Sequence, residues 1–251
     1  MSVEPIAGEA TRWLVASASR AGMQFIVDSD YTDDDGRRGW ACGCEDFQVR
    51  GHTCKHIDGV LEQIVSKIKH PRDEAMKVAA ELCRALKPAT ARLIVAGSLR
   101  RRKPEVGDIE ILYIPNIEQR QDAAELLPKL VAVNLVDEIL NGWLAAGVIV
   151  KRKSENGNEP WGAKNKFAVH AASGIPVDFF TATEANWFNY LVCRTGSAEN
   201  NTAICNAAIA RGMKWNPYGS GFTYEGKTIE VTKEADVFEL VGLKYKEPWQ
   251  R

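Results

Sequence analysis

The sequence predicts a mixed fold of α-helices and β-strands in which a small metal-binding module precedes a larger unit. Cysteine and histidine residues gather between positions 42 and 56. Further along, short apolar stretches typical of strands occur at residues 92–96, 108–112 and 175–180, and segments with helical patterns separate them. Because 45% of the 251 residues are hydrophobic and the net charge is −1, the chain can bury a core and is not expected to be disordered.

The cysteine-rich cluster has the pattern Cys42-x-Cys44, nine intervening residues, and then Cys54-x-His56. Three thiolates and one imidazole complete a tetrahedral set for one structural Zn²⁺ ion, with no position left open for a substrate. His52 is an alternative fourth ligand, and we favour His56. The four residues are therefore predicted to hold zinc.

The flanks of this cluster predict a strand at residues 23–27, a second strand at 38–42 and a helix that begins at His56 and ends at His70-Pro71. Apolar residues recur at helical spacing in that helix, at Ile57, Val60, Leu61, Ile64 and Ile68. The arrangement resembles the SWIM zinc finger, whose CxC…CxH pattern lies on a strand-strand-helix unit. The resemblance covers about residues 20–69 and implies a module that binds DNA or protein.

Three acidic residues in predicted strands form the candidate catalytic group. Asp108 and Glu110 alternate with apolar residues, so their carboxylates point to the same face of a strand. Such a pair repels itself unless a cation lies between, and Mg²⁺ suits oxygen ligands and substrate phosphates. Asp178 interrupts the apolar run 175–180, where a buried acid is costly without a partner. Asp178 is therefore the predicted third ligand.

A phosphate-binding segment is predicted just before these acids. Gly97 lets the backbone approach phosphate oxygens, and the Ser98 hydroxyl can donate to one of them. The arginines at 100, 101 and 102 follow directly and add cations suited to a triphosphate. The full pattern, Gly-Ser, nine residues, and then Asp-x-Glu, predicts a nucleotidyltransferase that uses two Mg²⁺ or Mn²⁺ ions.

Residues 92–251 resemble the catalytic part of the family X DNA polymerases, of the DNA polymerase beta kind. The order and spacing of several motifs carry this resemblance: Gly97–Arg101, Gly107–Glu110, Val177-Asp178, Thr195–Ser197 followed by Asn201, Asp236–Glu239 and Tyr245–Pro248.

The resemblance implies an α+β protein with a zinc-binding module (1–70), a linker helix and polymerase beta-like palm (71–183), and a C-terminal α+β subdomain that binds nucleotide (184–251). Asp108, Glu110 and Asp178 would hold the two metal ions, and Asp178 would also lie beside a primer 3′-hydroxyl. The nucleotide-binding residues would be Gly97, Ser98, Arg101, Gly107, Cys193, Arg194, Gly196 and Asn201. The implied partners are primer-template or gapped DNA and nucleoside triphosphates, in gap filling or repair.

The sequence departs from the family pattern at several positions. Glu110 replaces the usual Asp, Cys193-Arg194 replace a Tyr-Phe pair, and Pro176 stands where the family often has an arginine. The small Cys193 predicts weaker exclusion of a ribose 2′-hydroxyl. Residues 71–91 predict one helix without a GxG hairpin, so lyase activity and DNA-gripping hairpins are not expected. We hypothesise that the zinc module replaces those hairpins.

Two other functions remain open from sequence alone: a template-independent nucleotidyltransferase, and a non-catalytic, zinc-dependent DNA-binding protein. The near-zero net charge does not argue against DNA, because residues 1–70 are acidic and the remainder is slightly basic.

No secretory signal or membrane span is expected, which predicts an intracellular protein, cytoplasmic or nucleoid-associated, without a membrane partner. Residues 126–150 are expected to form one or two core helices, and residues 151–166 a hairpin loop.

Overall fold

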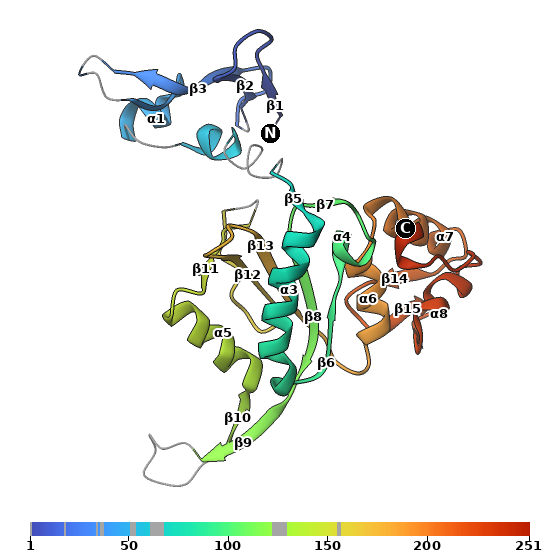
Figure 1. The fold of residues 1–251 in the computed structure, drawn as a ribbon. Helices are drawn as coiled ribbons and strands as arrows, with labels where there is room; N and C mark the ends of the chain where they lie inside the picture. Colours follow the sequence, from blue (N-terminus) through green and yellow to red (C-terminus); the bar gives the residue numbers. More distant parts are fainter. Residues whose placement is uncertain are drawn as a thin grey trace. The chain divides into compact units, whose positions relative to one another are not determined.

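The computed structural model describes residues 2–17, 19–33, 35, 38–50, 54–60, 68–121, 130–154 and 157–251. It divides into two compact units, an N-terminal unit of Met1–Ile68 and a C-terminal unit of Lys69–Arg251. Both units contain helices and strands, so the predicted mixed fold is confirmed (Figure 1). The alternative zinc ligand His52, the helix residues Leu61 and Ile64, and residues 126–129 lie outside the described residues.

The N-terminal unit is built on a four-stranded antiparallel sheet in the order β1-β2-β3-β4. Its elements are β1 (Val3–Pro5), β2 (Arg12–Ala16), β3 (Gln24–Thr32), β4 (Arg38–Cys42), α1 (Glu45–Arg50) and a helical segment at residues 55–60. Both predicted strands are present, although β3 is longer than predicted. The helix beginning near His56 is also present, but Ile68 is exposed and not helical, so its predicted place in that helix is wrong.

The C-terminal unit contains a five-stranded sheet in the order β11-β12-β13-β8-β6, in which only the β13–β8 pair is parallel. The strands are β6 (Thr90–Val95), β8 (Ile109–Pro115), β11 (Ile149–Lys151), β12 (Asn165–His170) and β13 (Pro176–Thr181). β11 and β12 pair antiparallel on either side of the predicted hairpin loop, of which residues 155 and 156 lie outside the described residues. The three predicted apolar strands correspond to β6, β8 and β13.

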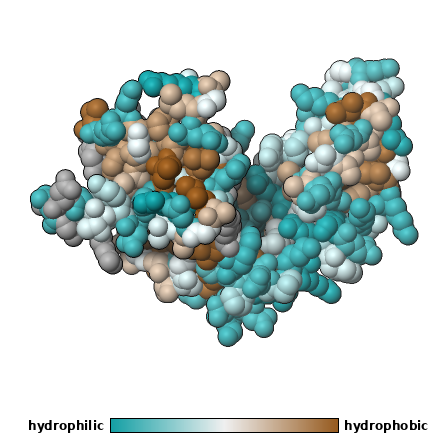
Figure 2. Space-filling model, turned by 90° about the horizontal axis from the view of Figure 1, so that it is seen from above, coloured by the Kyte–Doolittle hydropathy of each residue, from teal (hydrophilic) through white to brown (hydrophobic). Residues whose placement is uncertain are grey.

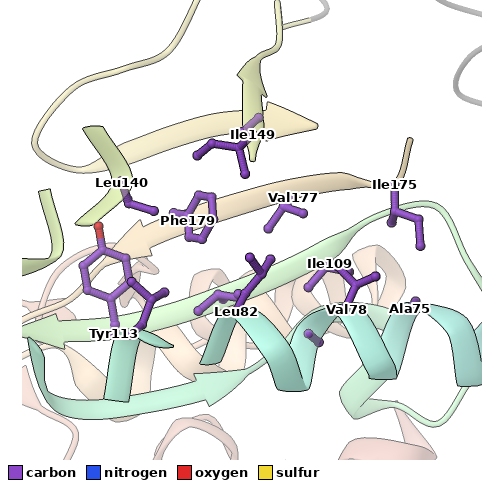
Figure 3. Close-up of a cluster of buried hydrophobic side chains, with 14 of the residues drawn as sticks. Ala75, Val78, Leu82, Ile109, Tyr113, Leu140, Ile149, Ile175, Val177 and Phe179 are labelled. Carbon is purple, nitrogen blue, oxygen red and sulfur yellow. The ribbon is translucent and has the colours of Figure 1, made fainter. Parts of the chain in front are cut away.

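Two helices, α3 (Arg72–Leu86) and α5 (Leu135–Ala145), cover one face of this sheet. The apolar residues of α3 recur at helical spacing, so Ala75, Val78 and Leu82 all face the sheet. There they meet alternate residues of β8 and β13, among them Ile109 and Phe179, in one buried cluster (Figure 3). This face is therefore apolar core.

The opposite face of the sheet carries α6 (Trp187–Thr195), which packs on Leu112, Ile114 and Phe180. The short helix α4 (Gly97–Arg100) also contacts β8. Because side chains alternate along a strand, Glu110 lies on the same face as Leu112, and Asp178 on the same face as Phe180. The carboxylates therefore lie on the face that the α3–α5 core leaves free.

The C-terminal part of the chain folds around a second buried cluster that includes Val192, Ile204, Phe222 and Phe238. Its elements are α7 (Ala198–Ile209), α8 (Glu234–Glu239) and an antiparallel sheet of β14 (Lys214–Asn216), β15 (Gly221–Tyr224) and β16 (Lys227–Glu230). Asn189 of α6 joins this sheet to the helix, because its Nδ2 donates to Asn216 O at 2.7 Å and its Oδ1 accepts from Trp215 Nε1 at 2.7 Å.

One core helix, α5, lies within residues 126–150 as expected, but residues 149–150 belong to β11, and a helix is also wrong for residues 130–134. These residues form β10 (Leu130–Asn134), which pairs antiparallel with β9 (Ile117–Gln121) in a two-stranded ribbon. The half-buried Val131 and Val133 alternate with the exposed Leu130 and Ala132, which is the two-residue period of a strand. Two further short strands, β5 (His70–Pro71) and β7 (Glu105–Val106), pair with each other.

The described residues contain no helix that is long and apolar enough to cross a membrane. On the face of the molecule that Figure 2 views, hydrophilic residues are widespread and hydrophobic residues occur in small groups.

Candidate functional site

The four predicted zinc ligands converge in the N-terminal unit. Cys42 ends β4, Cys44 precedes α1, and Cys54 and His56 stand at the start of the helical segment 55–60. Their donor atoms all lie within 4.8 Å of one another, and His56 Nδ1 is 3.8 Å from Cys42 Sγ and 3.9 Å from Cys54 Sγ. Three sulfurs and one ring nitrogen at this spacing can hold a zinc ion.

Burial determines the protonation of these ligands before any metal binds. All four side chains are buried, and burial raises the pKa of the Cys42 and Cys54 thiols while it lowers the pKa of His56. The imidazole is therefore neutral, as a ligand must be, whereas the thiols must lose protons when they bind a metal. His56 is further held by the ring of Phe25, whose centroid lies 4.7 Å away.

In the C-terminal unit, β8 and β13 bring three carboxylates to one end of the sheet. Asp178 and Glu110 are register partners in the parallel β8–β13 pair, and Asp108 lies two residues before Glu110. Asp178 is only 7% exposed, and Glu110 Oε2 is buried without a hydrogen-bond partner in the described part of the chain. Buried oxygen atoms of this kind fit the hard ligand set that Mg²⁺ or Mn²⁺ prefers.

The carboxyl groups resist ionisation in this environment. Burial, reinforced by the neighbouring carboxylates, raises the pKa of Glu110 to about 8 and that of Asp178 to about 6. Burial also raises the pKa of Asp108. Such shifts in three adjacent acids are typical of a functional site, because a structural core has no need of them.

Arg152 holds the carboxylate of Asp178. Its Nη2 donates to Asp178 Oδ1 at 2.5 Å, and its guanidinium carbon lies 5.0 Å from the ring centroid of Phe167. Arg152 reaches Asp178 because its backbone pairs with Phe167, which is itself the register partner of Asp178. Pro176, which stands where an arginine was expected by resemblance, therefore leaves Asp178 with a guanidinium partner from another part of the chain.

The segment predicted to bind phosphate lies directly against the carboxylates. Gly97 has a φ of 61°, and a Cβ at this position would meet the Glu110 side chain at 3.2 Å, so only glycine fits without displacement. Ser98 Oγ is buried and has no hydrogen-bond partner among the described residues. A buried hydroxyl without a partner is free to bind a ligand oxygen.

Two cations complete this side of the site. Arg101 donates from Nη1 to Thr195 O, and its charge also acts on Asp108 and Glu110. Lys69 Nζ lies 3.1 Å from the point where a Cβ on Gly107 would be, which places its ammonium beside Asp108. Gly107 thus leaves room for a cation that an alanine would displace.

The expectation that Arg100 and Arg102 also serve a triphosphate is wrong in this structure. Arg100 forms a bidentate pair with Glu234 at 2.5 and 3.0 Å and donates to Thr195 Oγ1 at 2.7 Å. Arg102 stacks on Trp249, with its guanidinium carbon 4.3 Å from the ring centroid. Of these three arginines, only Arg101 remains beside the carboxylates, because Arg100 and Arg102 contact Glu234 and Trp249 near the end of the chain.

The remaining candidate residues lie at the end of α6 and the start of α7. Cys193 is half-buried, and its carbonyl accepts from Asn201 Nδ2 at 2.9 Å, while Asn201 Oδ1 is buried without a partner in the described ranges. Gly196 follows the helix with a φ of 67°, and a Cβ there would come within 3.0 Å of Arg101 Nη1. Arg194 stacks on Phe180, 3.7 Å from the ring centroid, and its charge acts on Glu110.

The structure adds Lys69 and Arg152 to the residues found from sequence. Lys69 precedes β5, whose pairing with β7 brings it next to Gly107. Arg152 follows β11 and lies 26 positions from Asp178. Neither position belongs to a recognisable motif. The only available signal was that three clustered acids need compensating cations.

Comparison with known proteins relates the last part of the chain to a polymerase family. The family model described as DNA polymerase beta thumb matches residues 190–251. The match begins within α6 and contains Cys193, Arg194, Gly196 and Asn201, whereas the three carboxylates lie outside it. It supports a DNA polymerase-like function and DNA binding for the chain. A comparison with curated proteins found no match.

Proposed function

We propose that this chain is a family X-type DNA polymerase that adds nucleotides to a primer 3′-hydroxyl by metal-dependent phosphoryl transfer, in gap filling or repair. The observation that carries the proposal is the convergence of Asp108, Glu110 and Asp178 on one sheet face, beside Gly97 and Ser98. The thumb match at residues 190–251, which follow this sheet in the chain, supports the proposal.

In this proposal Asp108, Glu110 and Asp178 hold two Mg²⁺ or Mn²⁺ ions. When bound, these ions would neutralise the phosphate charge and lower the pKa of the attacking hydroxyl. The buried, partnerless Oε2 of Glu110 and the three oxygen donor groups fit that role. In this proposal the surrounding region, residues 71–183, is the palm.

The protein's own residues would bind and orient the reactants. Ser98, Arg101 and Lys69, with the backbone at Gly97 and Gly107, would hold the triphosphate so that the 3′-oxygen can attack the α-phosphorus. The new bond forms as the bond from the α-phosphorus to its bridging oxygen breaks, and pyrophosphate leaves. Arg152 would orient Asp178 beside the hydroxyl that loses its proton. Cys193, Gly196 and Asn201 would contact the incoming nucleotide.

The N-terminal unit would contribute to DNA binding once it holds zinc. Its four converging ligands support one structural zinc ion. The spacing of these ligands and the helical segment that begins beside His56 support the resemblance to a SWIM finger. In this proposal the module (1–70) replaces the DNA-gripping hairpins that the sequence lacks.

Primer extension on gapped DNA and on single-stranded DNA, with Mg²⁺ or Mn²⁺, tests the proposal. We expect extension on the gapped substrate and at least a thousandfold loss in Asp108→Asn and Asp178→Asn, because each removes a charged metal ligand. Asp236→Asn is the matched control, since Asp236 caps α8 and lies outside the site.

Three other results of the primer-extension experiment would contradict the proposal. Equal extension on single-stranded DNA would instead establish a template-independent nucleotidyltransferase. DNA binding without extension would establish a non-catalytic binding protein. Full activity in Asp108→Asn would refute the assignment of the carboxylates.

A further inference from the structure

Arg194 occupies an unusual place beside the carboxylates. Its guanidinium carbon lies 3.7 Å from the ring centroid of Phe180, and the rings of Tyr190 and Tyr218 lie 5.3 and 5.4 Å from it. Arg194 Nε is buried without a hydrogen-bond partner in the described part of the chain. Three aromatic rings therefore hold this cation in place.

The position of Phe180 places that cation next to the site. Phe180 follows Asp178 by two residues on β13 and pairs in register with Leu112, just as Asp178 pairs with Glu110. Same-face neighbours on a strand are separated by about 7 Å. A guanidinium stacked on Phe180 therefore lies one step along the sheet from two carboxylates.

The charge of Arg194 reaches all three acids. Phe180, on which Arg194 stacks, is the same-face neighbour of Asp178, and the charge of Arg194 favours the ionised forms of Asp108, Glu110 and Asp178. Among the described residues, only the Cys42–His56 cluster has all its metal-donor atoms within 4.8 Å, so the carboxylates are not drawn together as tightly. A fixed cation therefore lies one step along the sheet from the carboxylates that would hold divalent ions.

We propose that Arg194 is a positioning residue that acts as the resident counter-cation of the three carboxylates and opposes the entry of divalent ions. The proposal rests on the proposed function, because it takes the carboxylates as the divalent-metal site. Without metal, the guanidinium reduces repulsion among the acids. With metal, it repels the ion, because like charges in a poorly solvated site interact strongly.

The two states of the site predict opposite effects of removing this charge. The metal-free protein should lose stability in Arg194→Met, because the acids lose a counter-cation. Metal binding should become tighter, because a divalent ion is repelled twice as strongly as a proton at the same place. The gain in metal affinity therefore exceeds the gain in proton affinity. A purely structural role for Arg194 would weaken metal binding instead.

The variants separate charge from packing. Arg194→Met keeps the length and the apolar contact with Phe180 but removes the charge, whereas Arg194→Lys keeps the charge and loses the planar stacking. Arg92→Met is the matched control. Arg92 also stacks on α6, 5.6 and 5.5 Å from the ring centroids of Trp187 and Phe188, and its ion pair is with Glu184 rather than with the site.

Mn²⁺ titration of the zinc-saturated, full-length chain, followed by electron paramagnetic resonance of free Mn²⁺, tests the proposal. Asp108→Asn identifies the part of the binding that belongs to the carboxylates. We expect Arg194→Met to bind Mn²⁺ on the order of tenfold more tightly than wild type. Without Mn²⁺ it should melt at a lower temperature than wild type, and added Mn²⁺ should raise its melting temperature by more than it raises that of wild type. Arg194→Lys and Arg92→Met should bind as wild type does.

Unchanged or weaker Mn²⁺ binding in Arg194→Met would overturn the proposal, while carboxylate-dependent binding by wild type would leave the proposed function standing. If wild type and Asp108→Asn bind Mn²⁺ equally, the metal-site assignment and the Arg194 proposal both fail. If Arg194→Met does not fold, the same Mn²⁺ titration is done on Arg194→Gln, which also removes the positive charge.

Discussion

The Cys42–His56 cluster and the carboxylates of Asp108, Glu110 and Asp178 differ in the charges around them. The raised pKa values of Cys42 and Cys54 come first from burial, and their other main contributions are neighbouring thiols and backbone groups. Around the carboxylates, by contrast, lie four cations whose charges favour ionisation: Lys69, Arg101, Arg152 and Arg194.

From this difference we expect the first site to need its metal in order to fold and the second site to fold without one. Three buried thiols gain little from one another, so a zinc ion bound here would supply the free energy that holds the four ligands together. The carboxylates are already compensated by arginine and lysine. Glu110 and Asp178 lie on strands, and Asp108 directly precedes one; an apolar core fixes the opposite face of these strands. Metal at the second site would therefore serve chemistry rather than folding.

Zinc removal should have the largest effect and should be confined to the N-terminal unit. Chelation of zinc, or Cys54→Ser, is expected to unfold this unit, because structural zinc contributes about 10 kcal/mol or more in small modules. Limited proteolysis should then cleave within residues 1–68 while residues 69–251 stay protected. Cys83→Ser, which alters a cysteine outside the cluster, is the control. An unchanged cleavage pattern after chelation would show that the unit folds without zinc.

The ion pair between Arg152 and Asp178 predicts a smaller, catalytic effect. Arg152→Gln should lower kcat about 10- to 100-fold and leave KM for the nucleotide nearly unchanged, because it removes one charge-assisted hydrogen bond to a single carboxylate. Arg152→Lys should restore part of the loss. Lys153→Gln removes a neighbouring exposed charge as a control. If kcat falls equally in Arg152→Gln and Lys153→Gln, the loss comes from removing a positive charge in this region and not from losing the contact with Asp178.

The raised carboxyl pKa values predict a pH dependence of stability in the absence of Mg²⁺ and Mn²⁺. A carboxyl group whose pKa is higher in the folded protein binds more protons when folded, so it stabilises at low pH and loses that contribution as pH rises. The free energy of unfolding should therefore fall from about pH 4 through pH 6 and 8, by up to about 1.4 kcal/mol per pH unit for each group.

Denaturant titration between pH 5 and 8.5 measures this slope. Glu110→Gln should flatten it above pH 6. The lowered pKa values of Glu234 and Asp236 act in the opposite direction, but only at more acidic pH. An identical slope in wild type and Glu110→Gln would mean that Glu110 does not carry the dependence.

The smallest expected effect concerns Cys193, which belongs to neither ligand set. Cys193→Tyr should raise the preference for dNTP over rNTP about tenfold, because a larger side chain at a sugar pocket excludes a 2′-hydroxyl, and single-group discrimination is of this size. The ratio of kcat/KM for the two substrates measures it, with Cys193→Ser as a control of similar volume. Strong dNTP selectivity in the wild-type chain would contradict the prediction.

Local sequence patterns predicted the strands and ligand clusters well. Strand alternation predicted that Asp108 and Glu110 share one face, because a period of two residues fixes side-chain direction. Asp178 was predicted from the acid in the apolar run 175–180, and β13 brings it into register with Glu110. The same reasoning failed at residues 130–134, where the apolar content was taken as helical although Val131 and Val133 alternate with exposed residues.

The positions of the arginine side chains were harder to predict than those of the carboxylates. Arg100 and Arg102 stand beside a phosphate-type motif, yet they bind Glu234 and Trp249 near the end of the chain. Their partners are more than a hundred positions away, so no local pattern could reveal them. The direction of a long, flexible side chain depends on which partners the fold brings within reach.

The sequence by itself determined which residues could be ligands: the spacing of Cys42, Cys44, Cys54 and His56, and the alternation around Asp108 and Glu110. Both are short-range properties: the spacing is read directly from the sequence, and the alternation follows from the backbone geometry of any strand. Only the tertiary structure decided which cations meet the acids. Arg152 reaches Asp178 through strand pairing, and Arg194 lies one step along the sheet from Asp178 because α6 packs on Phe180. Long-range electrostatic pairing depends on packing, and packing is a property of the whole fold.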